Sequence, residues 1–375
     1  MVSSVGRFIK TFEKNDIKIL EEMGFQVDIA TNTVLNDNDS LNELHNLVNN
    51  IEFPRRPFSL KTISATSKLL KLLKRNDYYA IHVHTPVAAF ITRLVVLLYK
   101  KKKMKIIYTC HGFHFNRNSS LLNWMLYYPI EYLMSFVTDL IITINQEDYE
   151  IAKKFKAKNV ELIAGVGIDL NRINSNQVNG DELRNALGYV NDFIIITIGE
   201  LSKRKNQKVI FEALSLLNSK NIRYILIGSG SEYLNLKKLA TKLNISDQIV
   251  FCGELQKDDV YKLINIADIG AIPSKIEGLG LAGLECLACG KPLIGSGYQG
   301  ISEYLKDGLT GFICKNNPET YAYRIKELVE NKTLIQTMKP NCIQMATKFD
   351  ISQSDKQMRK IYNSILGDTG CCVKL

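Results

Sequence analysis

One stretch in the second half of the chain decides the fold: an apolar strand runs through a glycine-rich loop into a helix of small residues. The strand is Ile269 to Ile272, and Gly290 and Pro292 end the helix before the next strand. The stretch reads Pro273-Ser274-Lys275-Ile276-Glu277-Gly278-Leu279-Gly280-Leu281-Ala282-Gly283-Leu284-Glu285. A strand, a loop and a helix in this order predict one unit of an open α/β sheet.

The loop and the start of the helix have the chemistry of an anion site. Gly278 and Gly280 lack a Cβ, so the backbone can approach a ligand closely. The first amides of a helix have no partner within the helix, and its dipole is positive there, which suits a diphosphate. Glu277 and Glu285 bracket this site, and carboxylates beside an anion are useful when they face sugar or ribose hydroxyls. A plainer interpretation is that the dipole alone favours acidic residues there.

The spacing of Glu277 and Glu285, with Glu277-Gly278-Leu279-Gly280-Leu281 in front, resembles the signature of glycosyltransferase family 4. The resemblance implies the GT-B fold, in which two Rossmann-like, doubly wound parallel-sheet domains face a cleft, and a reaction that retains anomeric configuration. It implies that Glu285 holds the ribose, that Glu277 contacts the transferred sugar, and that the amides of Gly278 to Leu281 meet the diphosphate.

The same family pattern extends upstream in the second half. A strand over Phe193 to Ile198 leads to Gly199 and then to Lys203-Arg204-Lys205, and three cations before a helix favour phosphate. Lys205 matches the family's lysine, whereas Glu200 stands where the family has an arginine, so Arg204 and Lys203 are both candidates to replace it. The resemblance also places Gly199 in the donor site and the turn with Gly253 and Leu255 beside the base. Gly228-Ser229-Gly230 is a weak dinucleotide motif because Tyr233 occupies the third glycine position.

Histidines mark the first half. His111 follows an apolar strand, and open α/β sheets bind ligands at such strand ends. The segments that carry a closer resemblance, to enzymes of bacterial exopolysaccharide and capsule clusters, are His82-Val83-His84-Thr85-Pro86, His111-Gly112-Phe113-His114-Phe115, Tyr127-Tyr128-Pro129-Ile130-Glu131 and Ile142 to Tyr149. That resemblance makes His111 a group that lines the donor pocket, and the predicted catalytic set is therefore His111, Lys205 and Glu277.

The run Leu121 to Tyr128 has two interpretations. Its aromatic residues can pack in a core, or they can form an amphipathic helix on the acceptor side that meets a lipid-linked sugar or the bilayer. The acceptor-side candidates are His114, Trp124 and Tyr127. The run Lys100 to Lys103 is likewise either a solvated helix end or a contact with an anionic membrane surface.

Composition limits the function classes. The 375 residues are 46% hydrophobic and carry a net charge of +10, which favours anionic partners. No apolar run reaches the length of a membrane span, so we expect a cytoplasmic protein, free or peripheral on the inner face of the membrane. Cys286 and Cys289 form a Cys-x-x-Cys pair without a second pair at ligand spacing, which favours structural thiols over zinc. A prenylation signal at Cys371 and Cys372 is weak because Lys374 follows.

Strand and helix patterns alternate along the chain. Met1 to Val5 predicts a short strand, Ile9 to Met23 a helix, and Phe25 to Ala30 a strand, while Asp37-Asn38-Asp39 lies in a polar loop. The Asn-rich run Asn171 to Asn179 is the best linker. We therefore predict an acceptor-binding domain over 1–168, a nucleotide-sugar-binding domain over 169–350, and over 351–375 a helix that crosses back to the first domain, followed by a polar tail.

The predicted activity is retaining transfer of a hexosyl or N-acetylhexosaminyl group from a UDP-sugar to a lipid-linked saccharide acceptor. No strong metal site is evident, and we expect no cofactor or metal because amides and cations can carry the charge. Two alternatives remain, namely a non-catalytic member that binds nucleotide sugar in a polysaccharide assembly and a nucleotide-sugar epimerase of the same fold. Nucleic-acid binding would explain only the charge, so we expect no nucleic-acid partner.

Overall fold

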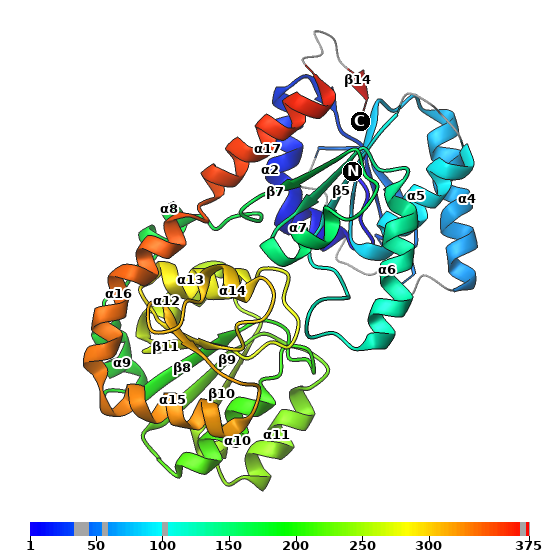
Figure 1. Ribbon diagram of the computed structural model, residues 1–375. Coiled ribbons are helices and arrows are strands. Elements are labelled where there is room, and N and C mark those ends of the chain that lie inside the picture. Colours follow the sequence, from blue (N-terminus) through cyan, green and yellow to red (C-terminus); the bar gives the residue numbers. More distant parts are fainter. Residues whose placement is uncertain (34–44, 55–58, 100–103, 368–372, 375) are drawn as a thin grey trace. The chain divides into compact units, whose positions relative to one another are not determined.

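The computed structural model describes the chain except residues 34–44, 55–58, 100–103, 368–372 and 375. It contains two compact units (Figure 1): unit 1 comprises Met1–Val166 and Ser352–Leu375, and unit 2 comprises Gly167–Ile351. The domain limits predicted from the sequence are residues 168 and 350. Asp37-Asn38-Asp39, Lys100 to Lys103 and the Cys371–Cys372 pair lie outside the described residues.

Unit 2 is built on a six-stranded parallel sheet with the strand order β10-β9-β8-β11-β12-β13. Its strands are β8 (Phe193–Ile198), β9 (Ile222–Ile227), β10 (Ile249–Gly253), β11 (Ile269–Ile272), β12 (Leu293–Gly295) and β13 (Gly311–Ile313). The first five residues of β8 and all of β11 are buried, because a parallel sheet is covered on both faces. The order of the chain reverses between β8 and β11, which is where open α/β sheets bind their ligands.

Helices cover both faces of this sheet. Figure 1 shows α12 (Lys257–Ile266) and α13 (Leu281–Ala288) on one side and α10 (Lys208–Leu217) and α15 (Pro318–Glu330) on the other. The remaining helices of unit 2 are α8 (Leu170–Ser175), α9 (Gly180–Leu187), α11 (Tyr233–Lys242), the 3₁₀-helix η2 (Ser246–Gln248), α14 (Ile301–Tyr304) and α16 (Lys332–Thr347).

Unit 1 has a parallel sheet with the order β4-β5-β6-β7. Its strands are β4 (Ala80–His84), β5 (Lys105–Cys110), β6 (Leu140–Thr143) and β7 (Asn159–Leu162), and a parallel pair β2 (Ile29–Thr31) and β3 (Val48–Asn50) lies beside them. Val2 makes parallel bridges to Ala30 and Val83 and thereby joins the pair to β4. The strand expected over Met1 to Val5 is therefore reduced to the bridges at Val2, and the order of the chain again reverses beside β4.

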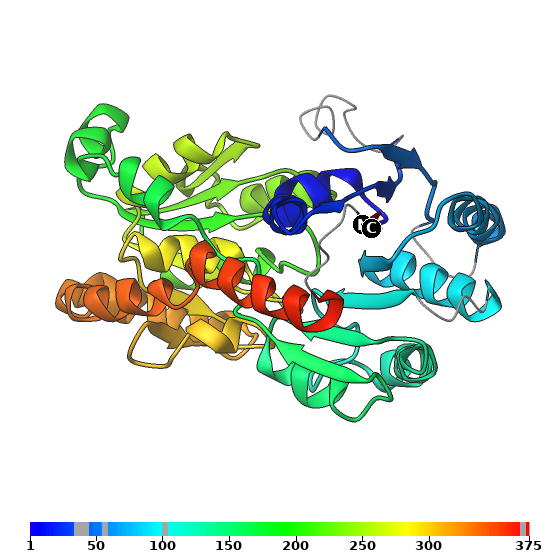
Figure 2. The ribbon, with the colours of Figure 1, turned by 90° about the horizontal axis from the view of Figure 1, so that it is seen from above.

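The helices of unit 1 include α17 (Ile351–Leu366), whose first residue belongs to unit 2. Figures 1 and 2 show α17 beside α2 (Lys14–Glu22). Asn15 donates hydrogen bonds to Asp355 at 3.1 Å, and the Tyr362 hydroxyl donates one to Asp16 at 2.9 Å. The other helices are α1 (Gly6–Phe8), the π-helix η1 (Ile9–Glu13), α4 (Leu60–Arg75), α5 (Pro86–Tyr99), α6 (Leu121–Ser135) and α7 (Gln146–Ala152).

Three local predictions were wrong in detail. The helix expected over Ile9 to Met23 begins as a π-helical turn, which places Glu13 in the interior. The strand expected over Phe25 to Ala30 is split into β1 (Phe25–Gln26), which pairs with β14 (Val373–Lys374), and β2. The predicted linker is largely helix α8, because the Asp169 side chain accepts a hydrogen bond from the Arg172 amide at 2.9 Å and caps it.

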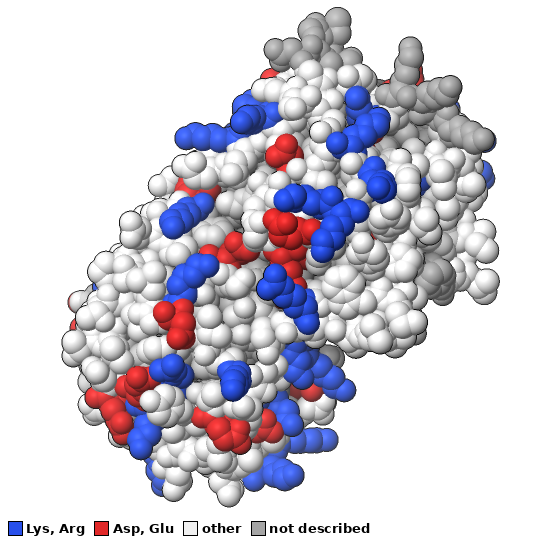
Figure 3. Space-filling view, viewed as in Figure 1, with Lys and Arg blue, Asp and Glu red and all other residues white. Residues whose placement is uncertain are grey.

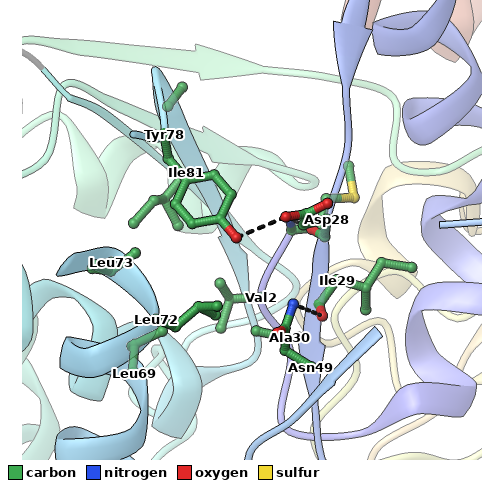
Figure 4. Close-up of a pocket in the computed structure, with 12 residues that line it drawn as sticks. Val2, Asp28, Ile29, Ala30, Asn49, Leu69, Leu72, Leu73, Tyr78 and Ile81 are labelled. Atoms are coloured by element: carbon green, nitrogen blue, oxygen red, sulfur yellow. Dashed lines mark hydrogen bonds between the residues drawn. The ribbon is translucent and has the colours of Figure 1, made fainter. Parts of the chain in front are cut away.

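A small, mostly apolar pocket in unit 1 lies near the starts of β2 and β4 (Figure 4). The Tyr78 hydroxyl donates a hydrogen bond to Asp28 at 2.8 Å, and Leu69, Leu72 and Leu73 of α4 line another side. Because the pocket lies at the amino ends of these strands, it is not where an open α/β sheet places its ligand. We interpret it as a packing gap beneath α4.

Candidate functional site

The site in unit 2 lies where the strand order reverses. β8 and β11 are hydrogen-bonded neighbours, with Ile195 paired to Ile269 and Ile196 to Gly270. The loop after β8 and the loop after β11 therefore leave the same edge of the sheet side by side. The residues of unit 2 that we predict to contact the diphosphate and the sugar all belong to these two loops or to the helix that follows β11.

Lys205 and Glu277 meet at this edge. The Lys205 ammonium forms an ion pair with Oε2 of Glu277, and both side chains are largely buried, with 15% and 11% of their surfaces exposed. The Ser274 hydroxyl donates a second hydrogen bond to the same oxygen at 3.2 Å. A charge-assisted hydrogen bond between largely buried groups is stronger than the contact of a solvent-exposed ion pair. The two residues predicted to be catalytic in unit 2 are thus brought together.

Arg204 is a second cation beside Glu277. Its Nη1 lies 3.6 Å from Glu277 and donates a hydrogen bond to the Ile276 carbonyl at 3.0 Å, and its Nη2 lies 3.7 Å from Glu200. Lys203 instead lines a different pocket with Ser202, Asn206 and Lys275. Of the two candidates to replace the missing arginine at position 200, only Arg204 shares the site of Glu277.

The glycine after β8 is required by its backbone conformation, and those after β9 are required by close packing. Gly199 has φ +138°, a backbone conformation that favours glycine, and a Cβ there would be at an ordinary contact distance from the Lys205 side chain. A Cβ on Gly228 would lie 2.2 Å from the Gly199 carbonyl oxygen, and one on Gly230 would lie 2.3 Å from that of Leu201. The Gly228-x-Gly230 motif therefore holds the loop of Lys205 in place, which explains its glycines without a dinucleotide.

The loop of Glu277 to Leu281 is held by backbone contacts. Gly280 has φ +83° and precedes α13, whose first turn has no side-chain cap. The Tyr304 hydroxyl donates a hydrogen bond to the Gly280 carbonyl at 2.9 Å, and a Cβ on Gly300 would lie 1.9 Å from the Gly278 carbonyl oxygen. Leu279 is buried below the loop. The uncapped amide end of α13 has the geometry expected of a diphosphate site.

Glu285 lies one turn into α13 and is buried, with its carboxylate paired to the Lys257 ammonium of α12. Sequence reasoning missed Lys257, because no pattern links residue 257 to residue 285 before the strands are ordered. Gly253 and Leu255, between β10 and α12, precede Lys257, and Leu255 is partly exposed. Gly253 has φ +68° and accepts a hydrogen bond from the Gly228 amide at 2.7 Å.

The Cys-x-x-Cys pair is buried in and beside α13 as free thiols. Burial raises the pKa of Cys289 to about 12 and that of Cys286 well above its usual range. Within the described residues, neither thiol belongs to a group of side chains that could hold a metal. The pair therefore packs the helix behind the glycine loop.

In unit 1, His111 follows β5 and lies against Glu13 and His84, whereas His114 is exposed. The His114 ring contacts Tyr127 edge-on at 5.1 Å, and the Trp124 indole donates a hydrogen bond to the Asn116 carbonyl at 3.0 Å. The predicted catalytic His111 belongs to unit 1, and Lys205 and Glu277 belong to unit 2. Sequence reasoning missed Glu13, because the regular helix it expected has no π turn.

Helix α6 has two different faces. Trp124, Tyr127 and Tyr128 pack against the core of unit 1, as the core interpretation predicts. Leu121, Leu122 and Met125 on the other face are exposed, with Leu122 at 71% and Met125 at 68%. The core interpretation therefore holds for one face of α6, and contact of the other face with an acceptor or a bilayer stays a prediction.

Comparisons with known proteins agree with this geometry. A model of group 1 glycosyl transferases matches residues 180–348, and a model of glycosyltransferase family 4 matches residues 17–172. EpsD of Bacillus subtilis, a protein named as a glycosyltransferase, is 31% identical over 373 residues, which cover 97% of this chain and 96% of EpsD. The chain belongs to the glycosyltransferases of group 1 and family 4.

More distant relatives of this glycosyltransferase have more specific names. The Escherichia coli UDP-Gal:alpha-D-GlcNAc-diphosphoundecaprenol alpha-1,3-galactosyltransferase is 24% identical over 313 residues, covering 81% of this chain and 80% of that enzyme. Among solved structures, Anabaena HepE in complex with UDP and glucose has a TM-score of 0.77 at 20% identity, with 97% of this chain and 98% of HepE covered. Sucrose-phosphate synthase from Thermosynechococcus elongatus has a TM-score of 0.78 at 16% identity, covering 98% of this chain and 96% of that one. These likenesses confirm the predicted GT-B fold of two parallel-sheet α/β domains.

Proposed function

We propose that this glycosyltransferase moves a sugar, with retention of configuration, from a UDP-sugar to a lipid-linked saccharide during bacterial exopolysaccharide or capsule assembly. The observation that carries the proposal is the Lys205–Glu277 pair beside the uncapped start of α13, at the point where the strand order reverses. HepE, which was crystallised with UDP and glucose, and the E. coli enzyme named for UDP-Gal and a diphosphoundecaprenol acceptor support the donor and acceptor classes.

The site residues have separate roles in this proposal. Lys205, with Arg204 beside it, and the first amides of α13 stabilise the negative charge that develops on the departing diphosphate. Glu277 holds hydroxyls of the transferred sugar, and Glu285 holds the ribose. Donor binding exchanges the Lys205–Glu277 ion pair for contacts of the ammonium with phosphate and of the carboxylate with sugar. Because fixed cations and amides carry this charge, the transfer step needs no metal at the diphosphate.

The acceptor side belongs to unit 1 in this proposal. The exposed Leu121, Leu122 and Met125 give α6 an apolar face, which suits an acceptor whose lipid lies in a bilayer. His114, whose ring contacts Tyr127 of the same helix, is the polar group proposed for the acceptor side. No described helix is long and apolar enough to cross a membrane. On the face shown in Figure 3, the described cationic and anionic side chains are interspersed, so the apolar face of α6 is the stronger argument for membrane contact.

The experiment is a transfer assay with a panel of UDP-sugars, with and without membrane extract that contains lipid-linked acceptors. We expect one donor to support transfer that Glu277→Ala and Lys205→Ala abolish. Lys208→Ala is the matched control, because Lys208 lies three positions away, is exposed and pairs with Glu212 instead of the site. If donors bind but no sugar is transferred under any acceptor condition, the chain is a non-catalytic member of the family that binds nucleotide sugar.

A further inference from the structure

A second group of titratable side chains lies in unit 1, where its strand order reverses. Glu13 ends the π-helix η1, His84 ends β4, and His111 follows β5. Oε1 of Glu13 lies 3.3 Å from Nδ1 of His84 and 3.4 Å from Nε2 of His111, and the two nitrogens are 3.3 Å apart. Three potential ligand atoms from three separate elements thus form a nearly equilateral triangle.

These distances fit the first coordination shell of a metal ion. An N–H···O hydrogen bond usually joins atoms 2.7–3.2 Å apart, and both contacts of Oε1 of Glu13 with the imidazole nitrogens are longer, whereas the two nitrogens lie within hydrogen-bond distance of each other. Ligand atoms bound at about 2.0–2.1 Å to a tetrahedral zinc ion are about 3.3–3.4 Å from one another. The triangle therefore has the size of one face of a zinc coordination tetrahedron.

Burial gives a second, independent argument. Glu13 is 2% exposed and His84 is fully buried, and Oε1 of Glu13 has no hydrogen-bond partner within the described part of the chain. A buried carboxylate oxygen without such a partner is costly unless a cation or a proton compensates it.

We propose that Glu13, His84 and His111 form a binding site for a divalent transition metal such as Zn²⁺, with a fourth position left to an oxygen ligand. Two imidazoles and one carboxylate are a donor set that zinc prefers. The π turn that places Glu13 here agrees with the frequent occurrence of such turns at functional sites. The site goes beyond the proposed transfer reaction, and a bound metal would occupy the Nε2 atom of His111, which is then unavailable to the sugar.

The test is metal binding by the full chain, without any activity measurement. Protein freed of metal with a chelator and kept reduced is titrated with Co²⁺ at neutral pH, and Zn²⁺ is then used to displace it. We expect one equivalent per chain, the visible absorption of four-coordinate cobalt, and no sulfur-to-cobalt charge-transfer band, which excludes the cysteines. Glu13→Gln and His84→Ala should each weaken binding at least tenfold.

His114→Ala is the matched control, because His114 comes from the same motif and is exposed. Glu13→Gln keeps the shape of the side chain, so this variant should fold, and its thermal midpoint in chelator shows whether it does. Zn²⁺ should raise the midpoint of the wild type and not that of Glu13→Gln. The proposal is overturned if the wild type binds no stoichiometric metal, if folded Glu13→Gln binds as tightly as the wild type, or if His114→Ala loses binding equally.

Discussion

Lys205 and Glu277 are 72 residues apart in the chain and form an ion pair that joins the loop after β8 to the loop after β11. The pair exists because β8 and β11 are neighbours in the sheet although β9 and β10 lie between them in sequence. It holds both groups in place before a donor arrives. Preorganised charges of this kind stabilise a transition state without reorganisation during the reaction.

Replacing Lys205 by Gln should lower kcat for transfer by roughly 10²–10³-fold, the usual cost of removing one group that stabilises a developing anion. Because Lys205 and Glu277 are in contact, the Lys205→Gln and Glu277→Gln effects should be strongly non-additive in the double variant. Steady-state kinetics of the four proteins measure this. Additive losses would mean that the two side chains act separately.

Arg204→Gln should raise the KM for the donor by about tenfold, because Arg204 is the additional cation beside Glu277 and a charge-assisted contact is worth about 1.5–3 kcal/mol at most when fully formed. Lys203→Gln removes an equal charge from the neighbouring position and should leave the KM unchanged. If Lys203→Gln has the larger effect, the diphosphate contact lies with Lys203.

Cys286 and Cys289 should resist alkylation in the folded protein. Burial raises the pKa of both thiols, so the reactive thiolate is scarce at pH 8, and reagent cannot reach them. Mass spectrometry after iodoacetamide treatment should find both peptides unmodified without denaturant and modified in guanidinium. Rapid labelling of either thiol in the folded state would contradict this packing.

Asp16→Asn should flatten the dependence of stability on pH. Burial, followed by the charge of Glu13, raises the pKa of Asp16 well above its usual range, while a hydrogen bond from Tyr362 opposes the shift. Because the pKa of Asp16 is higher in the folded than in the unfolded protein, the free energy of unfolding falls as pH rises from the unfolded-state pKa of about 4 toward the folded-state pKa. In chelator, the variant should lose less stability than the wild type between pH 5 and pH 8. Some pH dependence of stability should remain in the variant because Glu13 also titrates, since burial raises its pKa to about 8.

The exposed face of α6 should bind membranes. Replacing Leu122 and Met125 together by Glu should weaken binding to anionic vesicles at least several-fold, because two apolar contacts with the bilayer are lost and two negative charges are added. Leu60→Glu and Leu98→Glu together add the same charges at exposed positions on α4 and α5. Vesicle co-sedimentation compares the two proteins, and equal binding would mean that α6 is not the contact.

Local patterns predicted most of unit 2 from the sequence. The apolar runs of β8 and β11, the glycine loop and Lys205 all depend on short-range chemistry, and the family pattern of Glu277 and Glu285 lies within nine residues. The pairing of Lys257 with Glu285 could not be predicted this way, because it depends on which strands are neighbours. The same holds for the contact of Arg204 with Glu277.

Unit 1 was harder to predict for a physical reason. Its first strand is reduced to bridges at Val2, and the helix after it begins with a π turn, which changes which side chains point inward. The regular helical period expected from Ile9 onward gave no reason to place Glu13 beside His84. His84 itself was noted only as part of a family motif, because periodicity gives no signal for a histidine at the end of a strand.

The most direct measurement is transfer and UDP binding by Glu277→Gln, which keeps the size of the side chain and removes its charge. We expect wild-type protein to transfer sugar from a UDP-sugar. The variant should lose at least 100-fold in transfer rate and still bind UDP within about threefold of the wild type, since Glu277 acts on the sugar and the α13 amides on the phosphates. Wild-type transfer rates in Glu277→Gln would show that Glu277 does not act on the transferred sugar, and a wild-type protein that neither binds UDP nor transfers from any nucleotide sugar would overturn the proposed function.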